Sequence, residues 1–222
     1  MKLICVGGCS SRSGKTSVAC LLLRAFPGWA AMKVTPCRTD DVCPRGDDCG
    51  ACRPPEGLYE VTIDAEIPAR ARKDTGRLVE AGASHVAFVR ALPKCLPAAL
   101  ESAMGRLVLS LSKEVPGVVI ESTTAMPHIN GLRILVAREG FSEVKDSARK
   151  AAPLVDLFVM NQDASSLREV SAEDFPRTLR TRGKPCVSVC AALGPEHPRN
   201  REFVSHCRRF LEKERCDCTI AH

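Results

Sequence analysis

The chain has 222 residues, 45% of them hydrophobic, and this length and composition suit one folded domain rather than a disordered chain. Aromatic residues make up only 4% of the sequence, which argues against a protein that stacks the bases of single-stranded nucleic acid. The formal net charge of +6 is scattered along the chain, so a nucleic-acid partner is not indicated. The first apolar run, Leu3–Val6, is too short for a signal sequence or a membrane span, and we expect a cytoplasmic protein without a membrane partner.

Short apolar runs alternate with amphipathic stretches along the chain, a pattern typical of strand–helix units around a mainly parallel sheet. Strands are expected at residues 3–6, 29–34, 58–63, 85–89, 118–120, 132–136, 154–160 and 186–189. Helices are expected at residues 15–26, 73–81, 97–114 and 200–213. The order predicts one α/β domain over residues 1–222, with a cysteine-rich insert at 36–57.

A glycine- and serine-rich segment follows the first strand and leads into the first helix. The backbone N–H groups of such a loop form an anion-binding nest, and the helix N-terminus adds positive potential. Lys15 is expected to reach the β- and γ-phosphates of a nucleotide, and the Thr16 hydroxyl is expected to hold Mg²⁺. The expected phosphate-binding residues are Gly8, Ser10, Ser11, Arg12, Ser13, Gly14, Lys15, Thr16 and Ser17.

The spacing of the glycines in this segment is unusual. Gly8 lies six residues before Gly14, one more than in the common P-loop pattern, which would place a glycine at Cys9. The longer loop resembles the P-loops of dethiobiotin synthetase and of the cobyrinic acid amidating enzymes, in which a Ser/Thr-rich loop precedes Gly-Lys-Thr. This resemblance implies a three-layer P-loop NTPase fold.

Two polar residues follow apolar runs further along the chain. Glu121 ends the run Gly117–Ile120, so we expect it at the tip of a strand, where open α/β sheets bind ligands. There it can hold Mg²⁺ or polarise an attacking water, and a strand-end carboxylate that faces solvent is the alternative. Asn161 takes the position at which related NTPases contact the base. Residues 161–164 read Asn-Gln-Asp-Ala instead of the guanine-reading Asn-Lys-x-Asp, so ATP and GTP both stay open, with a lean toward ATP.

Residues 73–77 (Lys-Asp-Thr-Gly-Arg), followed by Glu-Ala-Gly-Ala at 80–83, resemble a motif of the molybdopterin-guanine-dinucleotide biosynthesis protein B family. That family consists of small P-loop NTPases. The resemblance implies that Lys73, Asp74 and Arg77 line the nucleotide or substrate side of the phosphate loop. Without the resemblance, the segment reads as the ordinary charged start of a helix.

The segment 36–57 has no periodicity and carries four cysteines. In a reducing compartment, clustered thiols bind metal more often than they form disulfides. Four thiolates complete a tetrahedral set for Zn²⁺ or supply the ligands of an Fe–S cluster, and the spacing does not separate the two. We expect a metal site, with free surface thiols as the alternative. The expected ligands are Cys37, Cys43, Cys49 and Cys52.

These features favour an NTP hydrolase that uses ATP or GTP with Mg²⁺, with Lys15 and Glu121 as catalytic residues. Its expected role is to assist the biosynthesis or delivery of a metallocofactor, of the molybdopterin or another type, with a partner protein of that process. One alternative is an ATP-dependent carboxylate ligase of the dethiobiotin synthetase or cobyrinic acid amidating type. A second alternative is a nucleotide-binding regulatory module. A homodimer is left open.

Overall fold

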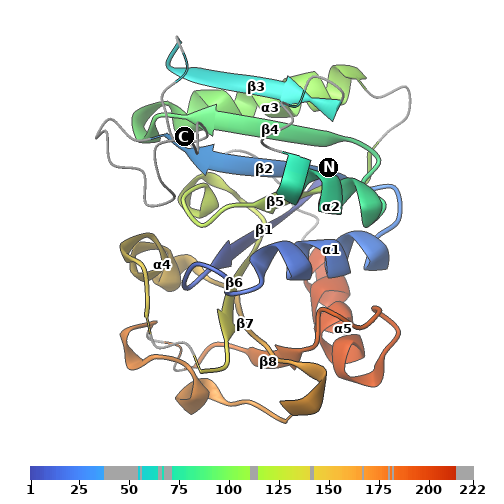
Figure 1. Ribbon diagram of the computed structural model, residues 1–222, viewed down its shortest axis with the longest axis vertical. Helices are drawn as coiled ribbons and strands as arrows, with labels where there is room; N and C mark the ends of the chain where they lie inside the picture. Colours follow the sequence, from blue (N-terminus) through green and yellow to red (C-terminus); the bar gives the residue numbers. More distant parts are fainter. Residues whose placement is uncertain are drawn as a thin grey trace.

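The computed structural model describes residues 1–37, 55, 57–64, 67, 72–110, 115–140, 143–166, 168–179, 181 and 183–213. In this part of the chain, eight strands form one sheet in the order β3-β4-β2-β5-β1-β6-β7-β8 (Figure 1). The strands are β1 (Lys2–Gly8), β2 (Ala30–Pro36), β3 (Tyr59–Ile63), β4 (Val86–Ala91), β5 (Gly117–Glu121), β6 (Leu132–Arg138), β7 (Leu157–Asn161) and β8 (Cys186–Val189). All neighbours pair in parallel except β3, which runs antiparallel to β4 at one edge.

Helices cover both faces of the sheet. They are α1 (Lys15–Ala25), α2 (Arg72–Glu80), α3 (Leu96–Ser110), α4 (Asp146–Ala151) and α5 (Pro198–Lys213). Short 3₁₀ turns lie at Pro93–Cys95, Met126–His128, Ala152–Leu154, Ala164–Ser166, Ala172–Asp174 and Arg177–Leu179. Among the described residues, no helix combines the length and the apolar character needed to cross a membrane.

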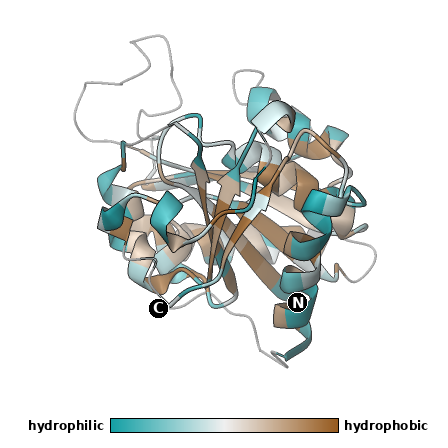
Figure 2. Cartoon of the chain, turned by 90° about the horizontal axis from the view of Figure 1, so that it is seen from below, coloured by the Kyte–Doolittle hydropathy of each residue, from teal (hydrophilic) through white to brown (hydrophobic). Residues whose placement is uncertain are grey.

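The core consists of two apolar layers, one on each side of the sheet. Successive side chains of a strand point to opposite faces. In β1, Leu3 and Cys5 therefore pack with α3 and α4 on one face, while Ile4 and Val6 pack with α1, α2 and α5 on the other. Figure 2 shows the apolar strands inside and the hydrophilic sides of the helices outside. The fold is α/β with helices on both faces of a mostly parallel sheet, as the alternation of runs predicts.

The expected elements are found, with shifted boundaries. Residues 154–160 were expected to be strand, but Leu154 ends a 3₁₀ turn and β7 begins at Leu157. Asp156 explains the later start, because its carboxylate accepts hydrogen bonds from the backbone N–H and the guanidinium of Arg133. The helix expected to end at residue 114 is described only to Ser110, and residues 111–114 lie outside the described part.

The centre of the sheet brings several loops to one edge. β1 lies between β5 and β6, and Val6 of β1 is in register with Glu121 of β5. β1 and β5 pair in parallel, as expected for a mainly parallel sheet. The chain fills the sheet on one side of β1 first and then crosses to β6 on the other side. Ligands of open α/β sheets bind beyond the carboxyl ends of strands at such a switch point.

Candidate functional site

The loop between β1 and α1 requires its glycines. Gly14 immediately precedes α1 and has φ of 88°, in the region that favours glycine. A Cβ atom on Gly14 would lie 2.2 Å from Asn161 Nδ2, and one on Gly8 would lie 2.2 Å from Ser13 Oγ. The buried hydroxyls of Ser10 and Ser13 have no hydrogen-bond partner within the described chain. Buried polar atoms are normally paired, so this loop has capacity for a polar ligand.

Glu121 lies beneath the start of α1 with its side chain fully buried. Its Oε1 atom accepts a hydrogen bond of 2.8 Å from the Thr16 hydroxyl and lies 3.9 Å from Lys15 Nζ. Its Oε2 atom is buried and has no partner in the part of the chain that the structure covers. The expected position of Glu121 at the end of a strand is confirmed, and the alternative of a solvent-facing carboxylate is wrong.

A second lysine, which the sequence analysis missed, contacts the same carboxylate. Lys33 of β2 is in register with Glu121 of β5, and its Nζ lies 2.5 Å from Glu121 Oε1 and 3.0 Å from Asp74 Oδ2. The Lys33 side chain is only 11% exposed. The signal was a charged residue within the apolar strand that runs from Ala30 to Val34. Buried charges are rare unless they are paired, so such a residue points to a polar site.

Helix α2 brings the 73–77 motif to the same place. Asp74 reaches Lys33, while the Arg77 guanidinium donates a hydrogen bond of 2.9 Å to the Ser17 hydroxyl on α1. Leu78 is fully buried and packs with α1, which fixes the position of α2. Lys73, in the first turn, faces the same cavity.

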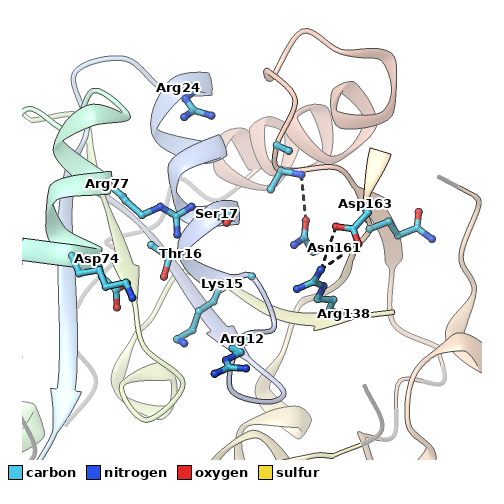
Figure 3. A pocket seen from close by; sticks show the side chains of 15 residues that line it. Arg12, Lys15, Thr16, Ser17, Arg24, Asp74, Arg77, Arg138, Asn161 and Asp163 are labelled. Atoms are coloured by element: carbon cyan, nitrogen blue, oxygen red, sulfur yellow. Dashed lines mark hydrogen bonds and ion pairs between the residues drawn. The ribbon is translucent and has the colours of Figure 1, made fainter. Parts of the chain in front are cut away.

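These elements surround a cavity of about 990 Å³, shown in Figure 3. Six cationic side chains and two carboxylates line it. The cations are Arg12, Lys15, Arg24, Lys73, Arg77 and Arg138, and the carboxylates belong to Asp74 and Asp163. The excess of positive charge in a concave site favours a ligand with several negative charges.

The wall opposite α2 is formed by the ends of β6, β7 and β8. Arg138 and Asn161 are register partners on β6 and β7. Arg138 forms an ion pair of 3.2 Å with Asp163, and Asn161 Oδ1 accepts a hydrogen bond of 3.2 Å from the backbone N–H of Ala191 (Figure 3). Ala192 completes this wall.

Burial and the neighbouring charges shift the pKa of Lys15. Burial lowers the pKa of its ammonium group, and repulsion by Lys33 lowers it further, while Glu121 acts in the opposite direction. In the adjoining loop, burial raises the pKa of the Cys9 thiol to about 12. Cys9 is therefore a packed, protonated core residue.

The oxygen atoms near α1 suit a hard divalent cation. Mg²⁺ prefers carboxylate and hydroxyl oxygens together with phosphate and water. Thr16 Oγ1 and Glu121 Oε1 lie side by side, and the unpartnered Glu121 Oε2 adds a further acceptor. These residues fit Mg²⁺ bound together with a phosphate ligand.

The cysteine cluster is described only at its first member. Cys37, just beyond β2, is buried, and this burial raises its pKa although the Arg90 guanidinium lies beside it. Cys43, Cys49 and Cys52 lie outside the described residues. No group of three or more candidate metal ligands occurs within the described ranges. The four-cysteine site therefore stays a prediction.

The predicted site residues divide into three sets. Those that line the cavity are Arg12, Gly14, Lys15, Thr16, Ser17, Lys73, Asp74, Arg77 and Asn161. Those that belong to the adjoining loop or lie below α1 are Gly8, Ser10, Ser11, Ser13 and Glu121. The third set is the cysteines: Cys37 does not line the cavity, and Cys43, Cys49 and Cys52 lie outside the described residues. Lys33, Arg24 and Arg138 belong to the site but were not predicted.

Known proteins do not assign this chain to a family. Neither a comparison with protein-family models nor a search of curated proteins found a match.

Proposed function

We propose that this chain binds ATP or GTP with Mg²⁺ in the cationic cavity and hydrolyses it to the diphosphate and phosphate. One observation carries the proposal. Lys15, Thr16 and Lys33 converge on Glu121 at the start of α1, directly below a glycine loop. This combination supplies N–H donors, cations and a metal-binding carboxylate, which phosphoryl transfer requires together.

The backbone N–H groups of the loop and the N-terminus of α1 bind the phosphates. Lys15 compensates their negative charge, and Lys33 adds a second ammonium group beside Glu121. Fixed cations of this kind stabilise the charge that develops on the transferred phosphoryl group. Thr16 and Glu121 would hold Mg²⁺, which supplies further charge neutralisation when bound. The Glu121 Oε2 atom, which has no partner among the described residues, would be available to orient water.

The far wall accommodates the nucleoside. Asn161 lies against Gly14 at the start of α1, so a nucleotide with its phosphates on the loop extends its base toward β7 and β8. The guanine-reading motif is absent, and Asp163 forms an ion pair with Arg138. Binding is therefore tested with both ATP and GTP.

We place this hydrolysis in the biosynthesis or delivery of a metallocofactor. The support is the 73–77 motif, since Asp74 and Arg77 both lie at the proposed nucleotide site. The first cysteine of the segment, Cys37, lies directly after β2 and four residues beyond Lys33. A Zn²⁺ or Fe–S site that includes Cys37 would therefore lie close in sequence to Lys33 of the phosphate site.

The second candidate, a carboxylate ligase, is favoured by the surplus of cations on the α2 side of the cavity. Within the described chain, Arg24, Lys73 and Arg77 form no ion pair. These cations can attract a carboxylate toward the γ-phosphate. The carboxylate, in place of water, would then receive the phosphoryl group.

Titration calorimetry with Mg·ATP and Mg·GTP, together with phosphate release, tests the proposal. The wild-type protein is expected to bind and slowly hydrolyse one of the two nucleotides. Turnover that requires a small carboxylic acid would favour the ligase, and tight binding without turnover would favour a regulatory module. Absence of binding to either nucleotide would refute all three.

A further inference from the structure

One buried side chain outside the cavity holds the loop that follows β8. Asn200, in the first turn of α5, is fully buried. Its Oδ1 atom accepts a hydrogen bond of 3.0 Å from the N–H of Cys190. Its Nδ2 atom donates to the carbonyl oxygens of Cys190 at 3.0 Å, Leu193 at 3.2 Å and Gly194 at 2.9 Å. Both polar atoms of this amide are directed at the loop 190–194.

The helix that carries Asn200 is a firm support. Phe203, Val204 and Cys207 of α5 are buried and pack with the strands of the sheet. The loop itself closes with a backbone hydrogen bond of 3.0 Å from Leu193 to Cys190. An ordinary helix cap pairs with the backbone N–H groups of its own helix. The contacts of Asn200 go instead to the loop that connects β8 to α5.

This loop forms a wall of the cavity. Ala191 and Ala192 line the cavity, and the Ala191 N–H donates to Asn161 Oδ1 at 3.2 Å. Because Oδ1 is engaged in this way, Asn161 directs its Nδ2 toward Gly14. Hydrogen bonds thus connect α5 through Asn200 and the 190–194 loop to the amide that faces the proposed base site.

We propose that Asn200 is a positioning residue for nucleobase recognition. It fixes the 190–194 loop and, through Ala191, the amide of Asn161 before a nucleotide arrives. A wall ordered in advance spares the bound state the entropy cost of ordering it. This role of Asn200 rests on the proposed nucleotide function. Asn200 would strengthen binding of the base although its side chain does not touch the base.

The test compares nucleotide with inorganic triphosphate in Asn200→Ser, since the shorter hydroxyl cannot reach three carbonyl oxygens. Dissociation constants for Mg·ATP, Mg·GTP and Mg·triphosphate are measured by calorimetry. We expect the preference for the favoured nucleotide over triphosphate to fall about tenfold, or about 1.4 kcal/mol. The affinity for triphosphate should change less than about twofold, because its contacts lie at the loop before α1.

Cys207→Ala is the matched control, because Cys207 is also fully buried on α5 but, among the described residues, forms no hydrogen bond with the 190–194 loop. It should lower stability and leave the preference for nucleotide intact. An unchanged preference in folded Asn200→Ser would overturn the inference. Equal losses of nucleotide and triphosphate affinity, or equal behaviour of the two variants, would do the same.

Amide hydrogen exchange on the wild-type protein keeps the proposal testable if Asn200→Ser fails to fold. Residues 190–194 should be protected in the absence of nucleotide, and exchange at the rate of an exposed peptide would contradict a wall ordered in advance. Two further outcomes separate the inference from the proposed function. A wild-type protein that binds neither nucleotide nor triphosphate refutes the function, whereas one that binds both equally refutes only the role of Asn200.

Discussion

Replacing Glu121 with Gln removes the negative charge on which three donors of the site converge. In the wild-type protein the fully buried carboxylate lies 2.5 Å from Lys33 Nζ, 2.8 Å from Thr16 Oγ1 and 3.9 Å from Lys15 Nζ. The Gln side chain has nearly the same shape and retains an acceptor for the hydroxyl. The perturbation is therefore electrostatic and leaves two ammonium groups close together without their shared partner.

The expected size of the effect follows from burial. Removing one partner of a buried ion pair costs about 3–5 kcal/mol. Lys33 keeps its second partner, because Asp74 Oδ2 lies 3.0 Å from its Nζ, and this favours the lower end of that range. For a chain of this size, about 1 kcal/mol shifts the melting temperature by about 2–4 °C. Glu121→Gln should therefore melt about 6–12 °C below the wild type.

Thermal unfolding of the nucleotide-free protein, followed by circular dichroism, measures this difference. Asp146→Asn is the control, since it removes the same charge from an exposed ion pair with Arg149. Exposed pairs contribute about 0–1 kcal/mol, so the control should melt within about 4 °C of the wild type. A Glu121→Gln variant that melts no lower than the control would show that the Glu121 carboxylate does not stabilise the folded protein through Lys15 and Lys33.

Three further predictions concern other charged groups and thiols. Lys15→Met should abolish nucleotide binding without lowering the melting temperature at neutral pH. The pKa of Lys15 in the folded protein lies below its ordinary value of 10.5, so holding the protonated ammonium group lowers the stability of the folded state. This loss of stability should disappear as the pH rises toward 10.5. A wild-type protein that melts at a higher temperature than Lys15→Met at neutral pH would contradict the prediction. Cys9, with its pKa raised to about 12, should stay unlabelled by iodoacetamide at pH 8 in mass spectra of the folded protein. Cys49→Ser should release the metal from anaerobically purified protein, and metal at background level in the wild type would reject that site.

Most of the fold could be predicted because the strands of a doubly covered sheet are short apolar runs. Glu121 was predictable at a strand tip for the same reason, since the run before it is uninterrupted. The antiparallel direction of β3 could not be predicted, because an edge strand of five residues carries no signal for its orientation. The start of β7 depended on a side-chain contact between Asp156 and Arg133, which are far apart in sequence.

The site was only partly predictable. The loop before α1 has a local pattern that ties residue types to backbone geometry, so its residues could be named from the sequence. Lys33 needed the register between β2 and β5, which depends on strand order. Asn200 needed the position of α5 against the 190–194 loop, because an asparagine in a helical segment carries no signal of its own.

The most direct test of the central claim is equilibrium binding of Mg·ATP and Mg·GTP to the wild-type protein and to Lys15→Met, with folding checked by thermal unfolding. We expect saturable binding of one nucleotide to one site in the wild type and the loss of this binding in the variant, which should melt at or above the wild-type temperature. Equal binding by the two proteins, or no binding by the wild type, would contradict the proposed nucleotide site.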